Sequence, residues 1–192
     1  MPLNTLTIIS ILALLMSGFI FIKDYLLSAK VQVFFGDSIQ ISCREGGVEN
    51  EKKLILNCNF TNIRNHLGVI NGSKLQLLFP NGNMHEFNWK IFCRWERLNA
   101  THDGLPRSVP VLAKSSIFQI IIFVSEENFS WVKGKYKLSF RGWYNKEPYK
   151  NDSNINKTIY FSLDEQNASE INKFLTTGEG NIETRSIRIF NS

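Results

Sequence analysis

Short segments in which apolar and polar residues alternate run through most of this chain, and they constrain its fold more than any other feature. In KYKLSFRGWY, residues 135–144, Tyr136, Leu138 and Phe140 alternate with Lys, Ser and Arg. Successive side chains of a β-strand point to opposite faces, so such a segment buries one face and exposes the other. Similar alternating or apolar segments cover residues 31–35, 38–44, 53–60, 74–79, 84–95, 116–124, 157–163 and 182–190. The chain is therefore predicted to be all-β.

Turn residues separate these segments and predict how neighbouring strands are joined. Pro80 and Asn81-Gly82 lie between residues 74–79 and 84–89, which predicts a tight hairpin there. Strands joined by turns, each with one apolar face, favour two packed sheets. We therefore expect an immunoglobulin/fibronectin-like two-sheet β-sandwich. One short C-terminal helix is expected after Ser169, which can cap it, and before Gly178, which can end it.

The most apolar segment, Thr5–Ile22, has no charged residue and is 18 residues long. As a helix it would reach about 27 Å, close to the ~30 Å of a bilayer core. The sequence favours an N-terminal transmembrane helix that anchors the chain in the membrane. A cleaved signal peptide and a buried soluble helix are the alternatives. The predicted organisation is an anchor and juxtamembrane segment over residues 1–30, followed by a single β-sandwich domain over residues 31–192.

The side of the membrane on which the domain lies is indicated by two opposed signals. Lys23 and Lys30 follow the apolar segment and weakly favour a cytoplasmic domain. Seven Asn-x-Ser/Thr triplets, against two to three expected by chance, favour an extracytoplasmic one. The alternative is an asparagine-rich bacterial chain whose polar turns produce such triplets. We expect a single-pass protein with an extracytoplasmic domain. The triplets begin at Asn59, Asn71, Asn99, Asn128, Asn151, Asn156 and Asn167.

Two of the three cysteines occupy apolar positions of predicted strands. Cys43 alternates with Ile39 and Ile41, and Cys58 with Leu54 and Leu56, so both thiols should point to the core. They are predicted to form a disulfide or to remain buried free thiols. No metal site is expected, because the cysteines and histidines lack the spacing of metal ligands.

The chain contains none of the short motifs that mark common enzymes. It has no Gly-x-Ser-x-Gly elbow and no glycine-rich phosphate loop. We therefore expect no enzymatic activity and no cofactor. The alternative is an enzyme that uses His102-Asp103, which lie in a segment, residues 96–110, expected to be a long loop.

A basic strand provides the candidate binding surface. Lys135, Lys137, Arg141 and Trp143 share the outward face of residues 135–144. This stripe could bind an anionic surface, either lipid headgroups or an acidic glycan. The alternative is an edge strand that its charges protect from aggregation. Nucleic acid is not expected, because a net charge of +5 is modest.

A resemblance to known proteins rests on the order of five segments, which are CNFTN, GVI, LQLLFPNGNMHEFNWKIF, VPVLAKSSIFQIIIF and WVKGKYKLSFRGWY. This order resembles membrane-anchored bacterial proteins that contain an immunoglobulin-like or fibronectin-like sandwich, over residues 31–163. The resemblance implies a fold and no activity. The function expected from the sequence is that of a membrane-anchored, non-enzymatic domain that binds an unidentified protein or surface. The alternative is a glycosylated, receptor-like extracellular domain of the eukaryotic secretory pathway.

Overall fold

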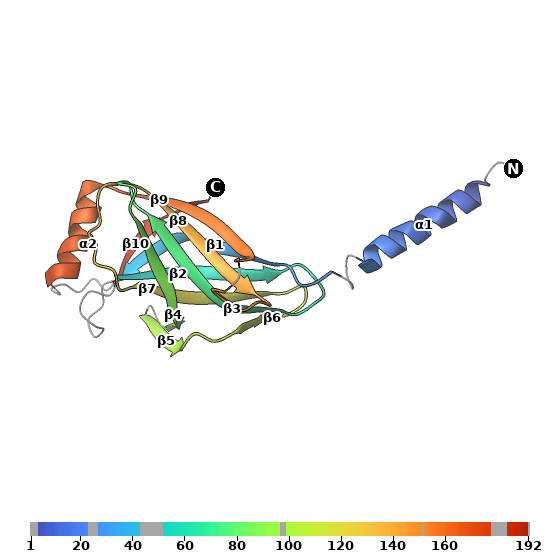
Figure 1. Ribbon diagram of the computed structural model, residues 1–192, viewed down its shortest axis with the longest axis horizontal. Coiled ribbons are helices and arrows are strands. Elements are labelled where there is room, and N and C mark those ends of the chain that lie inside the picture. The colour runs from blue at the N-terminus through green and yellow to red at the C-terminus, as the bar shows by residue number, and fades with distance from the viewer. Residues whose placement is uncertain are drawn as a thin grey trace.

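The computed structural model describes residues 4–22, 27–42, 52–96, 99–150, 152–177 and 184–191. Strands dominate this part of the chain, and a helix lies towards each end (Figure 1). In chain order the elements are α1 (Thr5–Phe21), β1 (Val31–Ser42), β2 (Lys52–Asn62), β3 (Gly68–Leu78), β4 (Met84–Glu96), β5 (Asn99–Gly104), β6 (Val109–Val111), β7 (Ser116–Ser125), β8 (Gly134–Tyr144), β9 (Ile155–Leu163), α2 (Glu165–Thr177), β10 (Thr184–Arg188) and β11 (Phe190–Asn191).

The strands form one continuous sheet rather than two. Their order is β10-β1-β2-β7-β4-β3-β8-β9-β11, with β5 paired to β4 and β6 paired to β3. The prediction of a two-sheet sandwich is therefore wrong, although the prediction of a mostly β chain is confirmed. The reason is β7, which pairs with β2 on one side and β4 on the other, so the two halves of the sheet are joined through hydrogen bonds.

The C-terminal segment brings the two ends of this sheet together. Strand β10 pairs with β1, and β11, one residue further along the chain, pairs with β9. Between them, the Ile189 amide donates a hydrogen bond to the carbonyl of Asp37. The sheet therefore curls into a nearly closed form (Figure 1). Buried side chains fill its interior.

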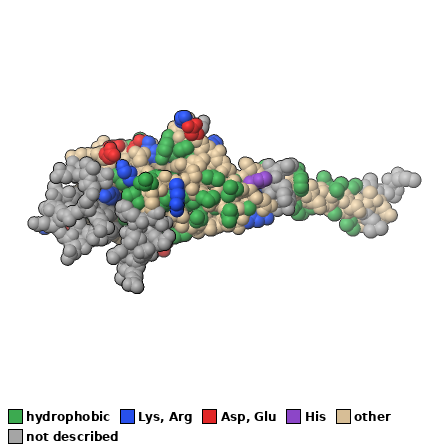
Figure 2. All heavy atoms as spheres, turned by 90° about the horizontal axis from the view of Figure 1, so that it is seen from below, with side chains coloured by type: hydrophobic (Ala, Val, Ile, Leu, Met, Phe, Trp, Pro, Cys, Tyr) green, Lys and Arg blue, Asp and Glu red, His purple; other side chains and the backbone are tan. Residues whose placement is uncertain are grey.

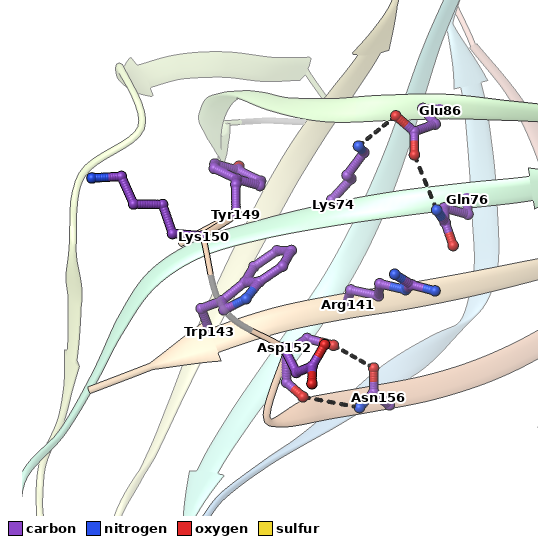
Figure 3. Close-up of a pocket in the computed structure, with 10 residues that line it drawn as sticks. Lys74, Gln76, Glu86, Arg141, Trp143, Tyr149, Lys150, Asp152 and Asn156 are labelled. Carbon is purple, nitrogen blue, oxygen red and sulfur yellow. Dashed lines mark hydrogen bonds and ion pairs between the residues drawn. The ribbon is translucent and has the colours of Figure 1, made fainter. Parts of the chain in front are cut away.

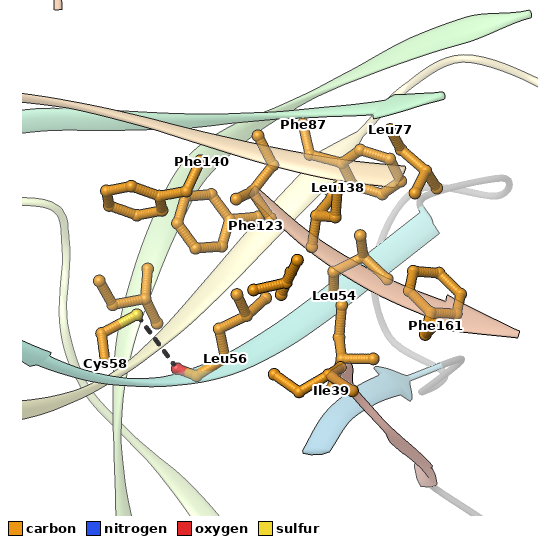
Figure 4. Packing of buried hydrophobic residues seen from close by; sticks show 14 of the residues in the cluster. Ile39, Leu54, Leu56, Cys58, Leu77, Phe87, Phe123, Leu138, Phe140 and Phe161 are labelled. Atoms are coloured by element: carbon orange, nitrogen blue, oxygen red, sulfur yellow. Dashed lines mark hydrogen bonds between the residues drawn. The ribbon is translucent and has the colours of Figure 1, made fainter. Parts of the chain in front are cut away.

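The core consists of the inward-facing residues of these strands. Leu54, Leu56 and Cys58 of β2 face Phe140 and Phe161 across the interior (Figure 4). The rings of Phe60 and Phe140 lie 6.3 Å apart, so opposite walls of the curled sheet touch. Burial of these apolar side chains is the main source of stability in such a fold.

Helix α2 covers one end of the core. Asp164 caps it, because its Oδ1 accepts a hydrogen bond from the Asn167 amide at 2.7 Å. The helix therefore starts at Glu165, earlier than the cap predicted at Ser169. Asn172 then fixes the helix to the preceding segment: its Oδ1 accepts from the Trp131 amide at 2.8 Å and its Nδ2 donates to the Trp131 carbonyl at 2.7 Å.

Helix α1 lies apart from the sheet, and its apolar side chains are exposed (Figures 1 and 2). It is 17 residues long, which corresponds to about 26 Å at 1.5 Å per residue. Of the helices in the described ranges, none has both the length and the apolar character needed to cross a bilayer. The prediction of a transmembrane helix over Thr5–Ile22 is therefore wrong.

Candidate functional site

The structure divides the predicted basic stripe of β8 into two parts. Lys135, Lys137 and Arg141 are exposed on the outer face, as the alternation predicts. Trp143 lies on the same face but is only 5% exposed. Arg141 and Trp143 line a groove, whereas Lys135 and Lys137 are absent from its lining. Of the four residues, Arg141 and Trp143 therefore belong to the groove, and Lys135 and Lys137 lie on the strand surface outside it.

The groove lies on the outer face of β4, β3, β8 and β9 (Figure 3). Strand register explains why distant residues meet there, since Arg141 of β8 pairs with Lys74 of β3 and with Asn156 of β9. Paired residues of antiparallel strands point to the same face. The cavity has a volume of about 730 Å³, and it is lined by Lys74, Gln76, Glu86, Arg141, Trp143, Tyr149, Lys150, Asp152, Ser153 and Asn156.

One wall of the groove is a loop, residues 145–150, that is fixed to β3. The Asn145 amide donates to the Val69 carbonyl at 2.8 Å, and the Asn145 side chain accepts from the Val69 amide at 2.7 Å. Asn71 Nδ2 donates to the Lys146 carbonyl at 2.8 Å. Asn145 has a φ of 52°, a conformation that asparagine tolerates better than most residues. The wall is therefore held in place before any ligand binds.

Two aromatic rings occupy the end of the groove next to this loop. Tyr149 covers Trp143, with ring centroids 4.8 Å apart and an interplanar angle of 56°. The Tyr149 hydroxyl donates to the carbonyl of Ser73 at 3.1 Å, which fixes the ring on β3. Tyr149 is itself 55% exposed, so part of its ring remains open to solvent. The covering by Tyr149 explains the burial of Trp143.

The charges of the groove are partly paired. Glu86 forms an ion pair with Lys74 and accepts a hydrogen bond from Gln76 Nε2 at 3.0 Å. These two contacts, and to a lesser extent the nearby charge of Arg141, hold the pKa of Glu86 below its ordinary value. Among the described residues, nothing forms a hydrogen bond or ion pair with the guanidinium of Arg141. Lys150, the remaining cation of the lining, forms an ion pair with Glu147. Among the cations that line the groove, Arg141 is therefore the one available to a ligand.

Lys137 and Lys135 have different surroundings from Arg141. Lys137 pairs with Leu78 of β3 and Tyr160 of β9, and both of these side chains are exposed. Lys135 pairs with Ser162. These lysines stand on open strand surface, where an isolated exposed charge contributes little binding energy.

Cys58 is a fully buried free thiol whose Sγ lies 3.8 Å from the Leu56 carbonyl oxygen. Burial raises its pKa, so the thiol stays protonated. Cys43 lies outside the described residues, as do the side chains of His102 and Asp103. Among the residues described, no group of three or more His, Cys, Asp or Glu is placed to hold a metal ion.

The sequence did not indicate most of the groove. Lys74 and Asn156 come from separate segments, and strand pairing places them next to Arg141. Tyr149 reaches the groove through the loop of residues 145–150 and its hydrogen bond to Ser73. The one usable signal was the loop NKEPYKNDSNIN, residues 145–156, because loops on a rigid sheet often carry binding residues.

Comparisons with known proteins give a weak structural likeness. No family model matches the chain, and no curated protein matches it. A candidate lipoprotein, ycdA from Bacillus subtilis, is similar with a TM-score of 0.41 and 13% identity, over 77% of this chain and 41% of that one. The candidate ApaA protein of Bordetella pertussis is similar with a TM-score of 0.34 and 6% identity, over 68% of this chain and 87% of that one.

Proposed function

We propose that this chain is a non-enzymatic binding protein that holds an acidic ligand in the groove around Arg141. The observation that carries the proposal is the guanidinium of Arg141, which lies exposed in the groove and has no ion-pair partner among the described residues. Arginine presents a planar set of donors that matches a carboxylate or phosphate. The fixed wall of residues 145–150 supports the proposal, because a preorganised site loses less entropy on binding.

The surroundings of Glu86, one of the two groove carboxylates, disfavour a role for it as a catalytic acid. Glu86 and Asp152 both line the cavity, as a pair of acids would in a glycoside hydrolase. Such an enzyme needs one carboxyl group with a raised pKa to donate a proton. Lys74 and Gln76 lower the pKa of Glu86, so it is a poor proton donor at neutral pH.

We propose further that the domain works outside the cytoplasm. The Asn-x-Ser/Thr triplets support this proposal where their asparagines are exposed and lie outside the groove, as at Asn59 and Asn128. The alternative, a glycosylated receptor-like domain, predicts a mass loss when the protein made in eukaryotic cells is treated with an endoglycosidase. A reporter fused after Ser192 that is active only outside the cytoplasm tests the compartment directly, and an inactive reporter would contradict it.

The binding proposal is tested by measuring retention of the full chain, in a zwitterionic detergent that shields α1, on a panel of acidic polysaccharides and anionic vesicles. Arg141→Gln should reduce retention, since it removes the positive charge while keeping polar donors. Lys135→Gln is the matched control, because this residue is on the same strand and face but outside the groove. Equal losses in both variants would reduce the interaction to general surface charge and refute the proposal.

A further inference from the structure

We infer that the ligand of the groove is an acidic glycan, a chain of sugars that carries carboxylate groups. This inference rests on the proposed function and narrows it to one chemical class. It follows from four properties of the site: an available arginine, an exposed aromatic ring, several polar side chains that can bind hydroxyl groups, and an open shape of suitable size.

Arg141 is placed to bind a single carboxylate. It is flanked across the strands by Lys74 and Asn156, and Lys74 is occupied by Glu86. The groove also contains two acids, Glu86 and Asp152, and their charges would repel a ligand with dense negative charge. A sugar chain carries its charges several ångströms apart, so one carboxylate can meet Arg141 while neutral parts of the chain lie near the acids.

Tyr149 provides a surface on which a sugar ring can stack. The face of an aromatic ring carries partial negative charge and attracts the partly positive C–H groups of a sugar. Its hydroxyl is fixed on Ser73 and its ring rests on Trp143, so the exposed part of the ring keeps one orientation. Tyr149 has a φ of 66°, which costs energy in a non-glycine residue and is maintained by these contacts.

Polar side chains opposite this ring suit hydroxyl groups. Asp152 can accept from two hydroxyls, and Asn156 and Ser153 line the same side. Ser153 Oγ donates to Asn156 Oδ1 at 2.6 Å, and Asn156 Nδ2 donates to the Ser153 carbonyl at 3.2 Å, so this pair is held in a fixed geometry (Figure 3). The cavity of about 730 Å³ falls in the range of small-ligand sites.

An anionic lipid surface fits the groove less well. Binding to a membrane interface uses apolar side chains that enter the lipid together with cations. Leu78 and Tyr160, which flank Lys137 on the neighbouring strands, are exposed but do not line the groove, where Tyr149 is the exposed aromatic residue. The open surface of the groove itself is mainly polar.

The test compares oligogalacturonate of three sugars with its methyl ester, which has the same rings without the charge. Affinity for the full chain in zwitterionic detergent is measured by calorimetry. Arg141→Gln should weaken binding of the acid about tenfold or more and leave the ester nearly unchanged, since it removes a charge-assisted contact. Tyr149→Ala should weaken both, and Tyr149→Phe, which keeps the ring, should retain most of the affinity.

The outcomes distinguish failure of the glycan inference alone from failure of the proposed function. If hyaluronate and alginate oligosaccharides also fail to bind but anionic vesicles bind in an Arg141-dependent way, the glycan is wrong and the acidic-ligand groove stands. Loss of acid binding in Lys135→Gln equal to that in Arg141→Gln would overturn both. Absence of binding to every acidic probe would overturn both as well. Unchanged thermal unfolding of Arg141→Gln, an exposed position, confirms that this variant is folded.

Discussion

Pro148, in the wall of the groove, lies so close to Gly72 that a larger residue at position 72 should displace the wall. A Cβ atom added at Gly72 would lie 2.6 Å from Cβ of Pro148 and 3.5 Å from the Tyr149 hydroxyl oxygen. The first distance is far below a van der Waals contact, so the loop must move away from β3. Gly72→Ala should therefore displace Tyr149 and weaken its hydrogen bond to Ser73.

The expected cost can be worked out from two opposing effects. Crowding of this kind costs about 1–3 kcal/mol. Because Gly72 is not among the described glycines with positive φ, alanine is allowed there and gains about 0.4–1 kcal/mol through the unfolded chain. We expect a net loss of about 1–2 kcal/mol, measured by urea unfolding followed through tryptophan fluorescence.

A double-mutant cycle identifies the contact as the cause. Pro148→Gly removes the atoms that an alanine at position 72 would meet, so Gly72→Ala should cost little in that background. The coupling should then be at least about 1 kcal/mol, as for residues in contact. The reasoning would be refuted if Gly72→Ala were as stable as the natural chain. It would also be refuted if the losses of unfolding free energy of Gly72→Ala and Pro148→Gly simply added in the double variant.

Three further predictions concern other residues. Cys58 should not react with a thiol reagent in the folded chain and should react once urea unfolds it, because burial raises its pKa; a fast native reaction would contradict its burial. The pKa of Glu86 in the folded chain lies below the ordinary 4.5, so its carboxylate stabilises the fold above that pH, and this stabilisation is lost as pH falls through the folded pKa. The free energy of unfolding of Glu86→Gln, measured with urea, should therefore fall less steeply than that of the natural chain below about pH 4.5. Tyr136→Phe should cost about 1–3 kcal/mol in thermal or urea unfolding, since the hydroxyl pairs with both Val132 backbone groups; an unchanged midpoint would show that water replaces it.

The sequence predicted local structure better than the pairing of strands. The hairpin between residues 74–78 and 84–88 is confirmed, because its turn residues determine it within a few positions. Alternation reports which face of a strand is buried, and a sandwich and a curled single sheet bury the same faces. Only the pairing of β7 with β4 and of the C-terminal strands distinguishes them, and those contacts join distant segments.

The same limit applies to the groove. Arg141 and Trp143 were found because they share the outward face of one strand. Tyr149 was missed because its role depends on a folded-back loop and on Ser73 of another strand. Residues 96–110 were expected to be a loop, but they include β5 and part of β6. These short segments become strands because their backbone groups pair with β4 and β3, respectively.

The pairing of residues 184–191 with both β1 and β9 also governs how the chain is made. During synthesis on the ribosome, β1 emerges early and has no β10 partner until about 150 further residues have followed. Until then two unpaired strand edges are available to other nascent chains. We expect a chaperone that covers such edges to raise the yield of the folded protein.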